Sequence, residues 1–223
     1  MSGGIITSVA GPGVLNIDCD AQSDGSSAPA TAAQLCSPSQ VAADGAGNIF
    51  IVDRNRIRKV SADGAITSIA GDGSVGDPTG GDGGPATQAL AHPNSVAVDS
   101  VGNVYFAEWA RVRKISPDGT IATVAGTGSR LGNNGCLPPQ GPSCGMGDAG
   151  PALLAQLWGP TNVAIDGPGN LYFVDRWLIR KVSPDGIIAT VAGNGGATGY
   201  RGYTGDGGSA QCTALESKWR GRR

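Results

Sequence analysis

The sequence of 223 residues predicts an all-β protein assembled from a repeated unit. Glycine accounts for 38 residues, well above its usual share of about 7%, and it recurs at regular places, which indicates many tight turns. Isoleucine, valine and threonine dominate the short apolar runs, and no long segment has helical periodicity. A third observation, a segment that occurs three times in one register, defines the unit that these strands build.

The three segments each run from a proline to a glycine and align without gaps. The glycine follows the proline by 33 positions every time (for example, 71 − 38 = 33), and the segments are residues 38–71, 93–126 and 160–193. The connections between them differ, with 22 positions from Gly71 to Pro93 and 34 from Gly126 to Pro160. Since a surface loop lengthens at little entropic cost, we predict a constant core in each unit and a variable loop between units.

Each unit contains four short apolar runs, which predict four strands; in the first unit they read VAAD, NIFIVD, RIRKVS and AITSIA. The turn between the first two runs has the pattern D-x-x-G-N, whose residue types tolerate positive φ. The nine residues expected to shape these structural turns are Asp44, Gly47, Asn48, Asp99, Gly102, Asn103, Asp166, Gly169 and Asn170. A second turn, S-x-D-G, separates the third run from the fourth.

Two residues separate the second and third runs of every unit, and this spacing predicts a tight hairpin. The cross-strand charge pairs expected from it are Asp53 with Arg56 and Glu108 with Arg111. Such pairs contribute from a few tenths of a kcal/mol to about 1 kcal/mol. In the third unit Leu178 replaces the arginine, so Asp175 is expected to lack that partner.

Four antiparallel strands per unit, repeated in tandem, are the arrangement of a β-propeller blade. An apolar run before the first unit, Ile5 to Ala10, is expected to be the orphan outer strand of a preceding blade. Because propellers close with about four to eight blades, we predict an incomplete propeller over residues 4–217, with three full blades and that strand. Residues 218–223 are expected to form an irregular basic tail. Open blade faces predict self-association, since they leave apolar surface uncovered.

At these residues the sequence resembles the NHL-repeat family of β-propellers. The motif that carries the resemblance is P-x-x-V-A-x-D-x-x-G-N-x-Y/F-x-x-D/E followed by R-K-V/I-S-x-D-G. The connections with GDGGPA are similar to those in NHL repeats of bacterial surface proteins and of the teneurins. The resemblance implies a non-catalytic binding or scaffolding segment, a fragment of a longer extracellular or cell-surface protein. The alternative is part of a catalytic six-bladed propeller, of lyase or lactonase type, whose active-site residues lie in further blades.

The chain itself is not expected to be an enzyme. Its single histidine, His92, cannot build the histidine and carboxylate metal cluster that such lyases and lactonases use, and the same shortage of histidine disfavours a Ser-His-Asp arrangement. The recurring aspartates are explained by turn chemistry. No catalytic, cofactor-binding or metal-binding residue is therefore assigned.

The glycine-rich stretch GGDGGPATQAL, residues 80–90, is interpreted as a turn. A phosphate-binding loop needs Lys and then Ser or Thr after its last glycine, but Pro85 and Ala86 follow here. Related stretches occur in the other connections, where PALLAQL predicts a short helical turn that covers a blade edge. A calcium site stays open as the one cofactor alternative, because carboxylates cluster in two connections: Asp72, Asp77 and Asp82, and Asp18, Asp20 and Asp24.

All five cysteines lie outside the repeated cores. The candidate disulfides are Cys136 with Cys144 and Cys19 with Cys36, which leaves Cys212 over. Zinc is disfavoured because the sequence has no C-x-x-C and one histidine. Disulfides imply an oxidising environment, whereas the N-terminus has no signal-peptide pattern. The location of this chain is therefore open, and the parent protein is predicted to be secreted or at the cell surface.

The net charge of −2 and the pI of about 5.3 disfavour nucleic acid as a partner. No apolar run reaches the roughly 18 residues of a membrane helix, so no membrane span is expected. The expected partner is a protein or a carbohydrate. We predict that it contacts the connections on one face, where Trp158, Tyr200 and Tyr203 occur.

Overall fold

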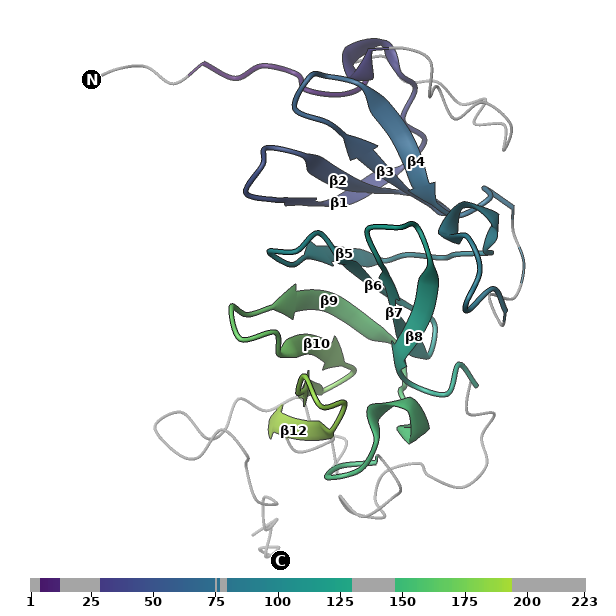
Figure 1. The fold of residues 1–223 in the computed structure, drawn as a ribbon, viewed down its shortest axis with the longest axis vertical. Helices are drawn as coiled ribbons and strands as arrows, with labels where there is room; N and C mark the ends of the chain where they lie inside the picture. The colour runs from purple at the N-terminus through teal and green to yellow at the C-terminus, as the bar shows by residue number, and fades with distance from the viewer. Residues whose placement is uncertain (1–4, 13–28, 75, 77–79, 130–146, 194–223) are drawn as a thin grey trace, which may run out of the picture.

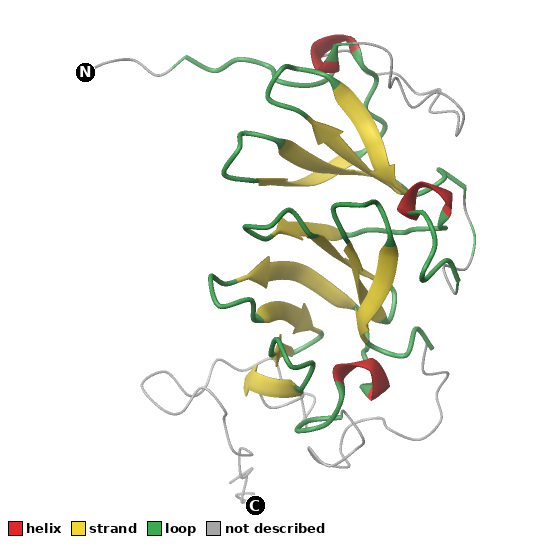
Figure 2. Cartoon of the chain, in the orientation of Figure 1, coloured by secondary structure: helices red, strands yellow, loops and turns green. Residues whose placement is uncertain are grey.

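The computed structural model describes residues 5–12, 29–74, 76, 80–129 and 147–193, and within them lie three four-stranded antiparallel sheets (Figures 1 and 2). Blade 1 consists of β1 (Pro38–Ala43), β2 (Ile49–Asp53), β3 (Arg56–Val60) and β4 (Ile66–Ala70). Blade 2 consists of β5 (Ser95–Val98), β6 (Val104–Glu108), β7 (Arg111–Ile115) and β8 (Ile121–Ala125). Blade 3 consists of β9 (Pro160–Ile165), β10 (Leu171–Asp175), β11 (Leu178–Val182) and β12 (Ile188–Ala192). The prediction of four-stranded blades in an all-β fold is confirmed.

Within each blade the strands pair in chain order, and the hairpin between the second and third strands has the predicted register. Asp53 lies opposite Arg56, and the corresponding pairs are Glu108 with Arg111 and Asp175 with Leu178. The pairing of the third strand with the fourth shifts at the same place in every blade. Such a bulge increases the local twist of a strand, so the three blades share their distortion as well as their topology.

The blades stack face to face, as Figure 1 shows, and their first strands β1, β5 and β9 contact one another across the blade boundaries. These are therefore the inner strands, and β4, β8 and β12 lie at the outer edge. One apolar cluster, which includes Phe50, Ile57 and Phe106, fills the space between blades 1 and 2. A second, which includes Leu157 and Phe173, fills the space between blades 2 and 3. Burial on both faces explains why the strands are apolar with little alternation.

The connection before each blade crosses the outer edge of that same blade. Before blade 2, Gly83 N donates to Ile121 O at 2.8 Å and Ala86 N donates to Gly119 O at 2.8 Å. The connection also holds the blade before it, because Gly71 N donates to Ala86 O at 3.0 Å. Each connection contains one turn of 3₁₀ helix: η1 (Ala30–Ala32), η2 (Ala86–Gln88) and η3 (Ala152–Leu154). The short helical turn predicted for PALLAQL is therefore confirmed.

A glycine ends the outer strand of each blade because no other residue fits there. Gly71 has φ +84°, and a Cβ atom on it would lie 2.0 Å from the carbonyl oxygen of Asn55. Gly126 and Gly193 have φ values of +88° and +93°, and a Cβ atom on them would lie 2.3 Å and 2.1 Å from the carbonyl oxygens of Ala110 and Trp177. Positive φ without steric cost is available only to glycine.

The orphan outer strand expected over Ile5 to Ala10 is not formed. These residues have no strand pairing, and Ile5 and Ile6 are 89% and 99% exposed. A strand needs a hydrogen-bonded neighbour, and the described residues offer none at this position. The residue after the run does match the other units: Gly11 has φ +83°, and its N donates to Ala30 O at 2.8 Å, the bond that Gly71 makes to Ala86.

The two ends of the described stack differ. On blade 1 the face away from blade 2 is buried, in a cluster of Ile51, Val60 and Ile66 with Ala30 and Ala33. On blade 3 the face away from blade 2 is partly open, because Ile179 is 37% exposed while its counterparts Ile57 and Val112 are fully buried.

Candidate functional site

Three arginines on the third strands form the buried polar framework of the molecule. Arg58, Arg113 and Arg180 are each at most 1% exposed. Each lies near an acid at the end of the neighbouring second strand, and the distances are 3.6 Å for Arg58–Asp53, 3.4 Å for Arg113–Glu108 and 3.7 Å for Arg180–Asp175. The hairpin register did not reveal this contact, because the arginine lies diagonally from the acid and not opposite it. The signal available in the sequence was the arginine that recurs two positions after the start of each third strand.

Each of these acids also fixes the entry of the chain into its blade. A carboxylate oxygen of Glu108 accepts a hydrogen bond from His92 N at 2.9 Å. In the other blades Asp53 accepts from Cys36 N and Ser37 N, and Asp175 accepts from Trp158 N. Charge-assisted bonds of this kind are stronger than neutral ones. The acids therefore join the end of each connection to the hairpin of the blade that follows.

The aspartate of the glycine-rich stretch completes this framework. Asp82 Oδ1 accepts from Arg113 Nη2 at 2.6 Å and from Arg113 Nε at 3.1 Å, and its Oδ2 accepts from Thr123 N at 2.9 Å. Burial acts to raise the pKa of Asp82, but the hydrogen bonds from Thr123 and Arg113 outweigh it and hold the pKa below its usual value. In blade 3 Asp148 binds Arg180 in the same way at 2.7 Å. The stretch is thus a structural contact with the blade.

The predicted charge contacts can be compared with the ion pairs of the structure. Asp175 lacks the cross-strand arginine, as predicted, because Leu178 lies opposite it, and Arg180 Nη1 lies 3.7 Å from its Oδ2 instead. In blade 1 the ion pair of Asp53 is formed with Arg58, while Arg56 donates to Asp72 O at 3.1 Å. The pair of Glu108 with Arg111 is present as predicted, at 3.0 Å.

Asp175 is almost completely buried, at 1% exposed. Burial raises its pKa above the usual value. The hydrogen bond from Trp158 N and the charge of Arg180 act in the opposite direction without overcoming burial. A buried carboxyl with a raised pKa is a common feature of functional sites, but an ion-pair framework produces the same shift.

The nine turn residues lie between the first and second strands of their blades. Asp44 Oδ1 accepts from Asn48 N at 2.9 Å, and its Oδ2 accepts from Asn48 Nδ2 at 2.6 Å. The same two bonds recur in the other blades, from Asn103 to Asp99 and from Asn170 to Asp166, and the glycines Gly47, Gly102 and Gly169 all have positive φ. The hydrogen bond from the Asn48 side chain lowers the pKa of Asp44, and that from Asn170 lowers the pKa of Asp166. These carboxylates are engaged within their own turns.

The hairpins between the second and third strands lie at the opposite ends of the strands from these turns, and we call the surface that they form the hairpin-tip face. Its first tip residues are Arg54, Trp109 and Arg176, with φ values of 57°, 39° and 59°. Large side chains avoid this region, at a cost of about 1–2 kcal/mol per residue. Asparagine or glycine would adopt it with less strain. The same unfavourable backbone conformation therefore occurs three times on one face, each time at a residue of another type.

Aromatic rings surround these tips. The guanidinium of Arg176 lies 4.9 Å from the ring centroid of Trp158 and 4.1 Å from that of Trp177, which is 52% exposed. The rings of His92 and Trp109 lie 5.5 Å apart. Trp158, expected at a contact face, is therefore part of this surface. Tyr200 and Tyr203 lie outside the described residues.

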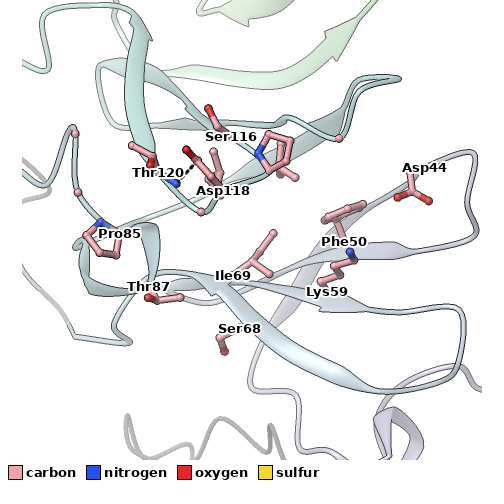
Figure 3. Close-up of a pocket in the computed structure, with 17 residues that line it drawn as sticks. Asp44, Phe50, Lys59, Ser68, Ile69, Pro85, Thr87, Ser116, Asp118 and Thr120 are labelled. Atoms are coloured by element: carbon pink, nitrogen blue, oxygen red, sulfur yellow. Dashed lines mark hydrogen bonds between the residues drawn. The ribbon is translucent and has the colours of Figure 1, made fainter.

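A groove of about 580 Å³ lies between blades 1 and 2, on the side of the other turns (Figure 3). Phe50, Lys59 and Ile69 of blade 1 form one wall, and the turn after β7 forms the other with Ser116, Asp118 and Thr120. The connection closes the groove through Pro85 and Thr87. Its volume is within the range of about 300–1,000 Å³ that small-molecule sites occupy.

Only one of the five cysteines, Cys36, belongs to the described part of the chain. Cys19, Cys136, Cys144 and Cys212 lie outside the described residues, so both candidate pairings stay predictions.

The calcium alternative concerns two acidic clusters. Asp82 is engaged by Arg113 and Thr123, and Asp72 Oδ1 accepts from Ser74 N at 2.8 Å. Asp18, Asp20, Asp24 and Asp77 lie outside the described residues. Among the residues that are described, no group of three or more His, Cys, Asp or Glu side chains could hold a metal ion. A search of the same residues also finds no helix with the length and apolar character to cross a membrane.

The stacked four-stranded blades, with their repeated turns and connections, define the class of this protein as an NHL-repeat β-propeller. Residues 5–78, 74–134 and 130–219 match the family model described as the teneurin NHL domain. The chain belongs to this family, as the resemblance implied.

Curated relatives agree with this assignment. The chain is 31% identical to teneurin-3 of Danio rerio over 198 residues, which is 84% of this chain and 6% of that protein. It is 27% identical to teneurin-1 of Homo sapiens over 201 residues, which is 86% of this chain and 7% of that protein. The chain thus spans less than a tenth of the length of these relatives.

Solved structures show the fold alone. A protein of unknown function from Bacteroides thetaiotaomicron matches with a TM-score of 0.50 and 20% identity, over 70% of this chain and 36% of that one. A gluconolactonase from Xanthomonas campestris matches with a TM-score of 0.45 and 15% identity, over 72% of this chain and 48% of that one. Similarity at this level carries no conclusion about activity.

Proposed function

We propose that this chain is a non-catalytic binding module of a longer secreted or cell-surface protein, and that its hairpin-tip face contacts a protein partner. The observation that carries the proposal is the positive φ shared by Arg54, Trp109 and Arg176. A strained conformation kept at three equivalent positions supports a role for the side chains that occupy them. Tryptophan and arginine are also the residue types that dominate binding energy at protein interfaces.

The ionisable groups of the blades are bound to one another, and this supports a scaffold role for the chain over a role in acid–base catalysis. The buried acids and arginines pair with one another in every blade. The single histidine has Nδ1 3.1 Å from Asn55 Oδ1 and Nε2 2.6 Å from Gly76 O. A general acid or base needs a nitrogen or oxygen within reach of a substrate. The alternative of a catalytic propeller needs residues outside the described blades and stays a prediction.

The candidate disulfides, Cys19 with Cys36 and Cys136 with Cys144, stay predictions and would support an extracellular location for the parent protein, because disulfides persist in oxidising compartments. Membership of the teneurin NHL domain family and the small share of the relatives that the chain spans support a longer parent. Self-association through the open face of blade 3 stays a prediction. Light scattering of the wild type against Ile179→Ser tests it.

The contact face is tested by affinity capture from the extracellular fraction of the native host, with the whole chain as bait. Trp177→Ser and Arg176→Ala remove the exposed ring and the guanidinium of blade 3. Val101→Ser is the matched control, since Val101 is 71% exposed on the turn at the other end of the strands. We expect a partner that the wild type and Val101→Ser retain and that both tip variants lose. Equal retention by all four proteins would contradict the proposal.

A further inference from the structure

The blade repeat places equivalent positions at both blade boundaries, and the side chains at these positions differ. In the groove between blades 1 and 2 three lining positions are occupied by Phe50, Thr87 and Thr120. The equivalent positions between blades 2 and 3 are occupied by Tyr105, Leu153 and Ile187. The first boundary therefore has two hydroxyls, from the connection and the outer turn, that the second lacks, and it lacks one hydroxyl from the sheet. We call the groove between blades 1 and 2 groove 1, and we use groove 2 as the name for the equivalent positions between blades 2 and 3.

The change from tyrosine to phenylalanine removes an internal hydrogen bond. Tyr105 donates its hydroxyl to Asp99 Oδ2 at 3.3 Å, and Tyr172 donates to Asp166 Oδ2 at 3.2 Å. Phe50 has no hydroxyl with which to make the corresponding bond to Asp44. Its ring is instead 3% exposed beneath Lys59, whose Nζ lies 5.8 Å from the ring centroid. The floor of groove 1 is thus apolar, with an ammonium group beside it.

The turn on the opposite wall shows a second departure. In blade 1 Ser61 Oγ donates to Asp63 Oδ1 at 2.5 Å, and in blade 3 Ser183 Oγ donates to Asp185 Oδ1. Ser116 makes no such bond to Asp118 within the described part of the chain, where Asp118 Oδ1 accepts from Thr120 N at 2.9 Å. The repeat therefore leaves the hydroxyl of Ser116 available at this groove, while its two counterparts are used in their own turns.

The lining of groove 1 combines hydrogen-bonding groups with an apolar floor. The hydroxyls of Thr87, Ser116 and Thr120 both donate and accept, the Asp118 carboxylate accepts, and the Lys59 ammonium donates. Ile69 and Pro85 supply the accessible apolar surface, since Phe50 is 3% exposed (Figure 3). A sugar ring presents the complementary surface, with hydroxyls at its rim and C–H groups on its faces. The two carboxylates of Asp44 and Asp118 against one ammonium give a net charge of −1, which disfavours an anionic ligand.

From this lining we infer that groove 1 is a binding site for a neutral carbohydrate, of one or two sugar units. The site goes beyond the proposed protein contact, because the hairpin-tip face lies at the opposite ends of the strands. The two can therefore fail separately. Groove 2, with Leu153 and Ile187 in place of the threonines, does not share the property.

The test uses the whole chain and ligand-observed saturation-transfer NMR. The probes are methyl β-glucoside, methyl β-galactoside, N-acetylglucosamine, cellobiose and lactose at millimolar concentration, with glucuronate as the anionic comparison. Thr120→Ile and Thr87→Leu copy groove 2 into groove 1, and both residues already occupy these positions in the neighbouring blade, so the fold is expected to hold. Ile187→Val and Leu153→Ala change groove 2 and serve as matched controls.

We expect saturation transfer from the wild type to at least one neutral probe, and an increase of about fivefold to tenfold in its Kd in each groove 1 variant, as for the loss of one hydrogen bond. The groove 2 variants should bind as the wild type does. The inference is overturned by the absence of transfer to every neutral probe, by tighter binding of glucuronate, or by unchanged Kd values in Thr120→Ile and Thr87→Leu with melting temperatures equal to that of the wild type.

Discussion

Blades 2 and 3 each have a buried acid at the end of the second strand, and the two blades pair its charge in different ways. In blade 2 Glu108 accepts from Arg111 Nε at 3.0 Å and from Arg113 Nη1 at 3.4 Å. In blade 3 Leu178 replaces the first arginine, and Asp175 has Arg180 at 3.7 Å. Both acids accept a backbone hydrogen bond from the end of their connection. The difference shows that the diagonal arginine is the constant element and that the arginine opposite the acid is optional.

The diagonal arginine is the constant element because it binds two segments of the chain at the same time. Arg113 and Arg180 each bind the acid of the hairpin on one side and the aspartate of the connection on the other. Removal of a buried cation leaves uncompensated charge in a medium that solvates it poorly. The optional arginine of blade 2, Arg111, forms one ion pair within the described residues, with Glu108. Four predictions test whether the two kinds of arginine differ in this way, and they follow in order of decreasing effect.

Arg113→Met is expected to lower the free energy of unfolding by about 3–5 kcal/mol, because it leaves Glu108 and Asp82 without their shared partner. The measurement is urea unfolding of the whole chain, followed by circular dichroism. Lys114→Met on the neighbouring, more exposed position is the control for the loss of a positive charge. A loss below about 1 kcal/mol, the size of a surface pair, would contradict the assignment of Arg113 as the constant element.

Asp82→Asn is expected to cost about 1–2 kcal/mol, since it weakens the bond to Arg113 on a side chain that is 42% exposed. We expect a similar cost for Asp148→Asn, because Asp148 Oδ1 accepts from Arg180 Nη2 at 2.7 Å on a side chain that is 46% exposed. The denaturation midpoints of the two variants and of the wild type measure both losses. A larger loss from Asp148→Asn would show that the connection before blade 3 depends more heavily on its ion pair.

Arg111→Leu converts blade 2 to the arrangement of blade 3. We expect a loss of about 1 kcal/mol at neutral pH, because Arg113 continues to pair with Glu108 and leucine fills the apolar volume. Urea unfolding curves of the variant and the wild type measure the loss. A loss above about 3 kcal/mol, the size expected when a buried pair is broken, would show that Arg111 is not optional.

The smallest expected effect is the pH dependence of stability that Asp175 causes, and the sign of this dependence is defined. Burial raises its pKa in the folded state above the usual 3.8, so the folded chain binds its proton more tightly than the unfolded chain does. The stability that the protonated form supplies is present below pH 3.8 and is lost as the pH rises through the raised pKa. Asp175→Asn removes this dependence. The free energy of unfolding of the wild type, minus that of the variant, should therefore be larger at pH 3.5 than at pH 7. A smaller difference at pH 3.5 would contradict the direction of the pKa shift.

Local pattern was enough to predict the strands, the hairpin register and the 3₁₀ turn at Ala152, because each depends on residues close in sequence. Contacts that join distant segments could not be predicted in this way. Asp82 and Arg113 lie 31 positions apart, and nothing in the spacing of either residue indicates the other. The strand expected at Ile5 to Ala10 was wrong for the related reason that strand formation requires a partner.

The same distinction, between residues close in sequence and residues brought together by the fold, applies to the candidate site. The turn aspartates were visible as a motif, but the hairpin-tip face was not, since Arg54 and Trp109 replace the asparagine or glycine that usually signals a tight turn. Groove 1 was invisible because its distinguishing residues, Phe50, Thr87 and Thr120, come from three separate elements. Only a comparison of one blade boundary with the next shows that they differ from their counterparts.

The hydrogen bonds of the connections determine where this chain can be cut and rejoined. A segment grafted from Pro93 onward would carry the sheet of blade 2 but leave behind Gly83, Ala86 and the carboxylate that binds Arg113. A segment that begins after Gly71 and ends at Gly126 carries all of them. The module that can be exchanged therefore runs from the glycine that ends one outer strand to the glycine that ends the next. It includes the connection before the blade, which the repeat visible in the sequence leaves out. This holds for duplication in evolution and for blade insertion by design.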